Sequence, residues 1–245
     1  MAASSYDAVA DLYDAIVTFD ADLPFLVEAA RAAGGPVLEL TAGTGRASLP
    51  LAREGVELVC VDGSRPMLDV LERRLRDEGL AAEVVRADVR ELDLGRTFPL
   101  ALFPFHALHE LVEADDRARA LAAVRRHVAA GGRFVCTLHN PAVRAASIDG
   151  EERALGAGVD AAGRRVELRG RFTLDPATTI VTGTQTWSVD GVERATVPVR
   201  FALFAPDAFE AEARAAGFEV EERFGDYDRA PYDAERSPHA IFVLG

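Results

Sequence analysis

Three acidic residues lie at the ends of three successive strand-like runs. Glu39 lies in PVLEL (36–40), Asp62 ends ELVCVD (57–62) and Asp88 ends AEVVRAD (82–88). The first run leads into Gly43 and Gly45; since a plain turn needs one glycine at most, two predict that the backbone approaches a group that is not protein. Asp62 suits the hydroxyls of a ribose, Asp88 an exocyclic amine, and Glu39 an ammonium group or the orientation of the glycine loop. These acids favour an adenosine with a cationic tail over a phosphate-rich ligand.

Three histidines follow the next two strand-like runs. His106 and His109 come after PLALFPF (99–105), and His139 ends RFVCTLH (133–139). A histidine that faces a substrate can act as a general base, so His109 is the first candidate catalytic residue, followed by His139 and His106. Each of them could instead cap a strand end or bind the backbone. His127, on the flank of a predicted helix, is expected to lie in solvent.

Regular alternation of strand and helix patterns runs through the first 139 residues. Strands are predicted at 36–40, 57–62, 82–88, 99–105 and 133–139, and helices at 6–19, 23–34, 46–55, 65–79 and 115–132. Strands separated by helices of this length predict a doubly wound α/β fold, with a parallel sheet covered on both faces. In such a sheet, ligands bind at the carboxyl ends of the strands, where the candidate residues lie.

The remaining chain changes its pattern. Residues 165–175 and 178–204 alternate with period two, and Asp190-Gly191 is a strong hairpin signal, so an inserted antiparallel meander of about three strands is predicted. A helix at 206–217 and strands at 218–227 and 239–245 complete the pattern. We expect a single domain, 1–245, divided into an N-terminal helical part (1–35), a ligand-binding core (36–138), the inserted meander (139–204) and a C-terminal part (205–245).

Composition excludes several classes of partner. The net charge is −13 and no lysine or basic cluster is present, so a nucleic-acid partner is not expected. No apolar stretch is long enough to span a membrane, and the acidic start of the chain does not resemble a signal peptide. The two cysteines, Cys60 and Cys136, lie in apolar runs; as buried thiols they indicate a reducing, cytoplasmic location.

Four motifs in order resemble those of the class I S-adenosylmethionine-dependent methyltransferases. They are VLELTAGTGR, VCVDGSRPML, VVRADVREL and ALFPFHALHEL, within residues 36–138. The resemblance implies a Rossmann-like, seven-stranded, mostly parallel sheet with an antiparallel last strand, plus the inserted meander and N-terminal lid helices. Thr41 stands where the family pattern has glycine; we expect it to stay in the extended region and to donate its hydroxyl to the amino-acid end of the cofactor.

The resemblance also implies the contacts of the cofactor, S-adenosyl-L-methionine. They fall on Tyr13, Glu39, Thr41, Gly43, Gly45, Arg46, Asp62, Gly63, Met67, Asp88, Val89 and Phe103. Among these, Arg46 would pair with the cofactor carboxylate, the Phe103 carbonyl would accept from its ammonium group, and Tyr13 would be a lid residue. Each has a structural alternative: for example, Arg46 could be a solvated helix residue and Tyr13 part of an apolar seam.

A methyl acceptor is expected at the same edge. Its candidate contacts are Tyr6, Phe105, His109, Asn140, Trp187, Arg200, Phe201, Tyr227 and Arg229. They suit a small, flat, polar or aromatic molecule, and the leading hypothesis is N-methylation of a heterocycle or amine in bacterial secondary metabolism by a monomer or homodimer. Alternatives are O-methylation of a phenol or hydroxyl, a methyltransferase-like protein with a non-methylating reaction, and an NAD-dependent oxidoreductase, which would need glycine at Ser48. His106, His109 and Glu110 could share a metal, but the paired acids of metal-assisted methyltransferases are missing and no metal is predicted.

Overall fold

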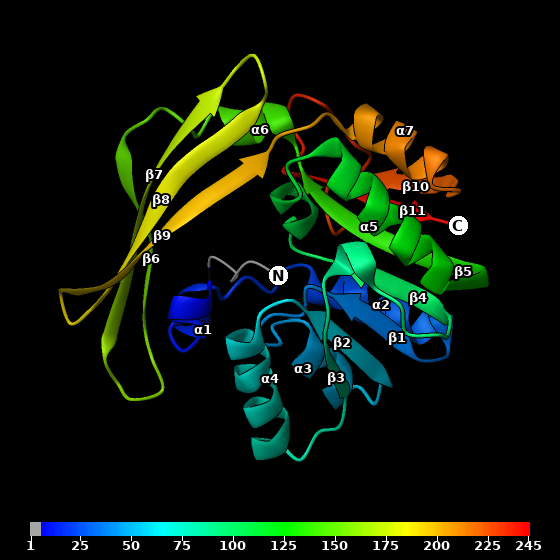
Figure 1. Cartoon of the computed structure of the whole chain (residues 1–245), viewed down its shortest axis with the longest axis horizontal. Helices are drawn as coiled ribbons and strands as arrows, with labels where there is room; N and C mark the ends of the chain where they lie inside the picture. The colour runs from blue at the N-terminus through cyan, green and yellow to red at the C-terminus, as the bar shows by residue number, and fades with distance from the viewer. Residues whose placement is uncertain (1–5) are drawn as a thin grey trace.

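The main body of the protein is a seven-stranded sheet, shown in Figure 1 for a computed structural model that describes residues 6–245. The strand order is β10-β11-β5-β4-β1-β2-β3. Strands β3, β2, β1, β4 and β5 are parallel, whereas β11 runs antiparallel to both β5 and β10. The predicted Rossmann-like sheet with an antiparallel last strand is confirmed. The strands are β1 (Val37–Leu40), β2 (Leu58–Asp62), β3 (Glu83–Arg86), β4 (Phe98–Phe103), β5 (Val128–His139), β10 (Val220–Phe224) and β11 (His239–Leu244).

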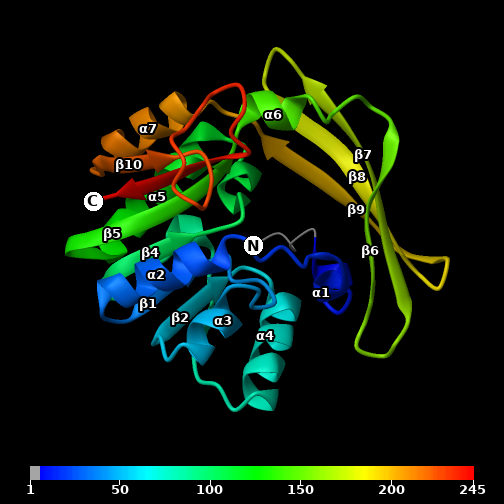
Figure 2. The same ribbon diagram turned by 180° about the vertical axis from the view of Figure 1, so that it is seen from behind.

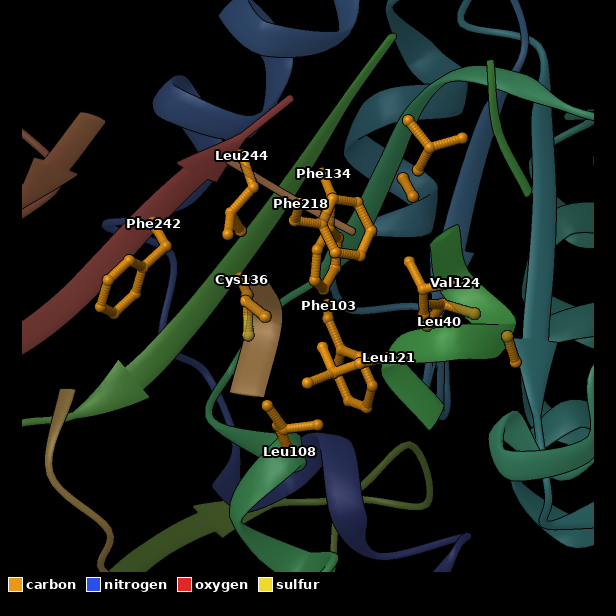
Figure 3. Packing of buried hydrophobic residues seen from close by; sticks show 14 of the residues in the cluster. Leu40, Phe103, Leu108, Leu121, Val124, Phe134, Cys136, Phe218, Phe242 and Leu244 are labelled. Carbon is orange, nitrogen blue, oxygen red and sulfur yellow. The ribbon is translucent and has the colours of Figure 1, made fainter. Parts of the chain in front are cut away.

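Helices cover both faces of this sheet because its strands alternate apolar side chains between two cores. Leu38 and Leu40 of β1 belong to the core under α5 and α7, whereas Val37 belongs to the core under α2, α3 and α4. Figure 3 shows the first core, in which Phe134 and Phe218 pack with ring centroids 5.2 Å apart. The helices are α2 (Leu23–Ala33), α3 (Ser48–Arg53), α4 (Arg65–Asp77), α5 (Ala114–His127), α6 (Pro141–Ala145) and α7 (Pro206–Ala215), with 3-10 turns η2 (Val89–Glu91) and η3 (Ala107–Glu110).

A second, antiparallel sheet is inserted between β5 and α7. It has four strands in the order β6-β7-β8-β9, one more than the sequence predicts. They are β6 (Glu152–Val159), β7 (Arg165–Asp175), β8 (Ile180–Val189) and β9 (Val192–Ala202). The sequence of β6, ERALGAGV, has two glycines and one β-branched residue, so its strand signal is weak. The predicted turn is confirmed at Asp190 and Gly191, whose φ angles are +50° and +78°.

The N-terminal segment fills the space between the two sheets. The predicted helix 6–19 is interrupted and consists of η1 (Asp7–Val9) and α1 (Tyr13–Ile16). In Figures 1 and 2, α1 lies between the second sheet and α4. Val9 and Leu12 are fully buried against Trp187 of β8, so this segment packs as part of the core. Within residues 6–245, no helix has both the length and the apolar character needed to cross a membrane.

Candidate active site

The loop between β1 and α3, residues 41–47 (the glycine loop), lies at the carboxyl edge of the sheet. Thr41 adopts φ +55°, and its hydroxyl donates to the Leu40 carbonyl at 2.6 Å. The expectation that Thr41 stays extended and offers its hydroxyl to a ligand is therefore wrong. A β-branched residue in the left-handed region carries strain of ~1–3 kcal/mol, which persists where the surrounding structure imposes the conformation.

The two glycines of this loop have different roles. Gly43 has φ +57° and open space where a side chain would stand, so this part of the backbone is accessible to a ligand. Gly45 has φ +92°, and a Cβ there would collide with Leu49 and Leu71. The first glycine therefore fits the predicted approach of a cofactor, while the second is required by packing against α3 and α4.

Asp62 joins the end of β2 to the glycine loop. Its carboxylate accepts hydrogen bonds from the Gly43 amide at 2.9 Å and the Ser64 amide at 2.8 Å. Burial raises the pKa of this carboxyl above its ordinary value, against the effect of these two bonds. Gly63, which is half-buried, lies between Asp62 and Ser64 in the chain. Asp62 thus stands beside the open backbone of Gly43, at the position expected for a ribose ligand.

Glu39 and Asp88 occupy different environments at the same edge. Glu39 is buried, and the hydroxyl of Ser48 donates to it at 2.5 Å; burial raises its pKa to about 7. This bond ties β1 to the first residue of α3, which matches the orienting role rather than contact with an ammonium group. Asp88 caps η2 through the Arg90 amide, and the guanidinium of Arg90 holds the Asp88 pKa below its usual value. Val89 begins that turn.

Three further cofactor candidates have distinct positions. Met67 is buried beside Tyr6 and Tyr13 in the first turn of α4, and Phe103 is buried at the end of β4. Arg46 instead forms a two-bond ion pair with Asp22, 2.6 Å for each bond, and also donates to the Phe19 carbonyl at 2.9 Å. Asp22 and Phe19 thus hold three of the five guanidinium N–H groups, and the pairing of Arg46 with a cofactor carboxylate stays a prediction.

Two lid candidates, Tyr6 and Tyr13, pack edge to face with ring centroids 5.7 Å apart. The N-terminal segment that carries them is attached to the cofactor side at two points. Asp14 accepts from the Thr44 hydroxyl at 2.6 Å and from Arg74 at 2.8 Å, and Asp7 accepts from the Ser64 hydroxyl at 2.5 Å. The segment thus covers the edge of the main sheet beside Met67.

Both tyrosines also line a cavity of about 230 Å³, called here the edge pocket. It lies between the N-terminal segment, η3, the end of β5, α6 and the second sheet. Its walls are Tyr6, Tyr13, Phe105, His106, His109, Glu110, His139, Arg144, Phe172, Gln185, Val199, Arg200 and Phe201. The structure therefore brings together eight of the residues that the sequence nominates as catalytic, lid or acceptor contacts: Tyr6, Tyr13, Phe105, His106, His109, His139, Arg200 and Phe201.

Four histidines gather at this edge and form the histidine cluster: His106, His109, His139 and His239. The His106 and His139 rings stack with centroids 3.8 Å apart, and His106 Nε2 lies 2.9 Å from His239 Nδ1. Burial lowers the pKa of all four imidazoles. The cluster is therefore neutral at pH 7. Within residues 6–245, no group of three or more His, Cys, Asp or Glu side chains is arranged to hold a metal ion.

His109, the first candidate base, is fully engaged by the backbone. Its Nδ1 lies 2.5 Å from the Ala202 carbonyl, and its Nε2 lies 2.9 Å from the His139 amide. A carbonyl only accepts and an amide only donates, so Nδ1 carries the proton and the Nε2 lone pair is already used. His109 fastens η3 to β5 and β9, and this geometry contradicts the role of general base. His139 has no such bond among the described residues and faces the edge pocket.

Four predicted acceptor contacts lie outside the edge pocket. Trp187 is buried behind Tyr13, the Asn140 amide donates to three carbonyls of the loop before β11, and Tyr227 packs among Phe19 and Phe25. Arg229 pairs with Glu28 of α2. None of the four side chains lines the edge pocket. Each instead contacts residues from a distant part of the chain.

His127 also differs from its expected position. It is buried, its Nε2 accepts from the Leu94 amide at 2.9 Å, and its Nδ1 donates to the Ala123 carbonyl at 2.7 Å. The end of α5 thus holds the loop before β4 through this ring.

Two polar residues of the edge pocket, Gln185 and Arg144, are not predicted from the sequence, and Glu110 is named there only with His106 and His109 as a group that could share a metal. Glu110 is exposed to the edge pocket, and loss of water around its carboxyl, with the nearby Asp62, raises its pKa to about 7. The side chain of Gln185 forms a hydrogen bond with Tyr6. Its amide oxygen is buried without a partner among the described residues. The sequence carries a signal for two of these residues. Glu110 ends HALHE, a segment with three polar residues after β4, and Gln185 shares the strand face of buried Trp187. Nothing in the local pattern indicates Arg144.

Comparisons with known proteins agree with this geometry. The family model described as a methyltransferase domain matches residues 37–132. A curated relative, the cypemycin N-terminal methyltransferase of a Streptomyces species, is 32% identical over 98% of this chain and 97% of its own. The solved structure of the CcbJ methyltransferase from Streptomyces caelestis has a TM-score of 0.85 at 26% identity, covering 99% of this chain and 97% of that one. The glycopeptide N-methyltransferase MtfA, complexed with S-adenosylmethionine, has a TM-score of 0.60 at 25% identity, with 93% and 95% covered.

The family model matches the strands and loops that carry Gly43, Asp62 and Asp88, and the relatives extend over the second sheet as well. The open backbone at Gly43 and the carboxylate of Asp62 beside it fit S-adenosylmethionine, the cofactor of this protein. The chain belongs to the class I S-adenosylmethionine-dependent methyltransferases.

Proposed function

We propose that the protein methylates the nitrogen of a small amine in bacterial secondary metabolism, and that the amine lies against Glu110 in the edge pocket. The observation that carries the proposal is the carboxyl group of Glu110, which lies in the wall of the edge pocket and forms no ion pair with another of the described residues. An N–H donor of a ligand would give this carboxylate the partner that it lacks.

The relatives support nitrogen as the methylated atom. The cypemycin relative acts, by its name, on an N-terminus, and MtfA is named as a glycopeptide N-methyltransferase. Both proteins match this chain over nearly its whole length.

Glu110 is suited to prepare an amine for methylation. When bound, S-adenosylmethionine supplies an electrophilic methyl group. An amine is protonated at neutral pH and must lose a proton before its lone pair can react; a carboxylate with a pKa of about 7 accepts that proton near neutral pH. Tyr6 and Tyr13 cover the pocket and exclude water.

A matched pair of variants tests the role of Glu110. Glu110→Gln keeps the shape of the side chain but cannot accept a proton. Glu57→Gln changes an exposed glutamate just before β2, at the opposite edge of the sheet. We expect Glu110→Gln to lower kcat/KM for an amine by 10²-fold or more, the usual scale of general-base catalysis, with unchanged cofactor binding. Glu57→Gln should behave like the wild type.

The acceptor screen distinguishes nitrogen from oxygen. The protein is incubated with labelled S-adenosylmethionine and matched amines and alcohols, such as benzylamine and benzyl alcohol, and products are identified by mass spectrometry. Turnover of the amines, with a rate that falls on acidification through about pH 7, supports the proposal. Turnover of hydroxyl compounds alone, or full activity of Glu110→Gln, would contradict it.

A further inference from the structure

Arg144 places an uncompensated positive charge in the edge pocket. Its Nη1 donates to the hydroxyl of Ser147 at 2.6 Å, and no carboxylate of residues 6–245 lies within ion-pair distance. Arg200, the other arginine of the pocket, is exposed and already pairs with Glu113 at 3.1 Å. Arg144 is thus the one guanidinium of this cavity, within the described chain, whose charge is free to meet a ligand.

The charge is held at the cavity wall by aromatic rings. The guanidinium carbon of Arg144 lies 5.4 Å from the ring centre of Phe201 and 5.8 Å from that of Phe172, within the range of cation–π contact. Burial lowers the pKa of Arg144, as expected for a cation that loses water without gaining an acid. Because the rings and Ser147 restrict the side chain, its planar fork is oriented before a ligand arrives.

Arg144 and Glu110 occupy separate parts of the edge pocket. Glu110 ends η3, whereas Arg144 lies in α6 against Phe172 and Phe201 of the second sheet. The two side chains form no ion pair with each other in the described part of the chain. The pocket therefore has a negative pole and a positive pole that do not neutralise one another.

We propose that Arg144 binds an anionic group of the methyl acceptor, a carboxylate or a phosphate, so that the substrate is an amine with an anion at its far end. The amine part of this inference rests on the proposed function. A guanidinium fork matches both oxyanions with two parallel hydrogen bonds. Binding of the anion by Arg144 fixes the distance and direction of the nitrogen at Glu110. Amines that have no anionic group lack this second contact.

Paired ligands test the anion pole. Protein saturated with S-adenosylhomocysteine is titrated calorimetrically with ω-amino acids from glycine to 6-aminohexanoate, 4-(aminomethyl)benzoate and 4-(aminomethyl)phenylphosphonate. Each carboxylate is compared with its carboxamide. We expect at least one anion to bind tenfold or more tightly than its neutral partner. Arg144→Gln should remove the preference and Arg144→Lys should retain part of it, while Arg76→Gln, on the exposed face of α4, should leave it unchanged.

The outcomes separate the two proposals. Equal binding of carboxylates and carboxamides, or no Arg144-dependent binding by any anion of the series, overturns the role of Arg144. Failure of the amine assignment has a different signature: butyrate would bind as tightly as 4-aminobutyrate, Glu110→Gln would have no effect, and the dependence on Arg144 would remain.

Discussion

Removal of Asp22 tests how the glycine loop is held in place. Asp22 precedes α2 and is fully buried, and the side chain of Arg46 that it binds is only 12% exposed. The two residues share two hydrogen bonds of 2.6 Å each. Asp22→Ala would therefore leave a buried guanidinium whose charge is uncompensated, with the Phe19 carbonyl as its remaining acceptor.

The expected loss of stability is large for one side chain. Breaking a buried ion pair from one side costs about 3–5 kcal/mol, because the remaining charge stays desolvated. For a chain of this size, each kcal/mol lowers Tm by roughly 2–4 °C, so we expect a fall of roughly 6–20 °C. Replacing both partners, as in Asp22→Leu with Arg46→Met, should restore part of the loss because no isolated charge remains.

The chain offers a matched control at its surface. Arg53 and Glu78 also share two hydrogen bonds, of 2.7 and 2.6 Å, but their side chains are 52% and 35% exposed. Water screens such a pair, so Glu78→Ala should leave Tm nearly unchanged. Calorimetric melting of the three variants and the wild type gives the comparison. If Asp22→Ala lowers Tm no more than Glu78→Ala does, burial does not set the strength of the Asp22–Arg46 pair and the reasoning is refuted.

Three further predictions concern the cofactor, the lid and pH. Asp62→Ala should weaken S-adenosylmethionine binding tenfold or more in calorimetric titration, the scale of a lost hydrogen bond to a charged group of roughly 1.5–3 kcal/mol; unchanged binding would remove the ribose assignment. Asp14→Ala, which frees α1 from the glycine loop and α4, should raise the dissociation rate of S-adenosylhomocysteine severalfold in stopped-flow experiments, and an unchanged rate would mean that these contacts do not hold the lid. Between about pH 6.5 and 4.5 the unfolded chain protonates its histidines, while His106, His109 and His139 stay neutral in the folded protein. Acidification should therefore lower stability by about 1.4 kcal/mol per pH unit for each of these imidazoles that is not offset by Glu39 and Glu110, whose raised pKa values act in the opposite direction. Urea midpoints that rise on acidification would refute the last prediction.

The sequence predicts best what local pattern determines. The five parallel strands follow from short apolar runs between amphipathic helices, and the antiparallel last strand follows from the family resemblance. The position of Asp62 beside Gly43 also follows, because a strand end and the next loop are fixed by neighbouring residues. Strand β6 escapes prediction since its glycines and alanines give only a weak strand signal, although pairing with β7 holds it extended.

Side-chain partners distant in the chain explain most of the remaining differences. Nothing near Arg46 in the sequence shows that Asp22 will take its guanidinium, 24 positions earlier. In the same way, His109 has the spacing expected of a catalytic base, but the Ala202 carbonyl, 93 positions away, fixes its tautomer and uses it as a structural link. Thr41 differs for a backbone reason, because the loop imposes a positive φ on a residue that disfavours it.

The two halves of the site differ in how readily sequence reveals them, and the reason is physical. The cofactor half is built from consecutive strand ends, so its residues keep fixed spacings and form motifs. The edge pocket is built where η3, the end of β5, α6 and the second sheet converge, so its spacings depend on an inserted sheet whose strands do not pair with the main sheet. Glu110 and Arg144 belong to this second half. Since His109 is bound to the backbone within the described residues, the poles of the pocket are better guides to its substrate than the histidines that the sequence makes conspicuous.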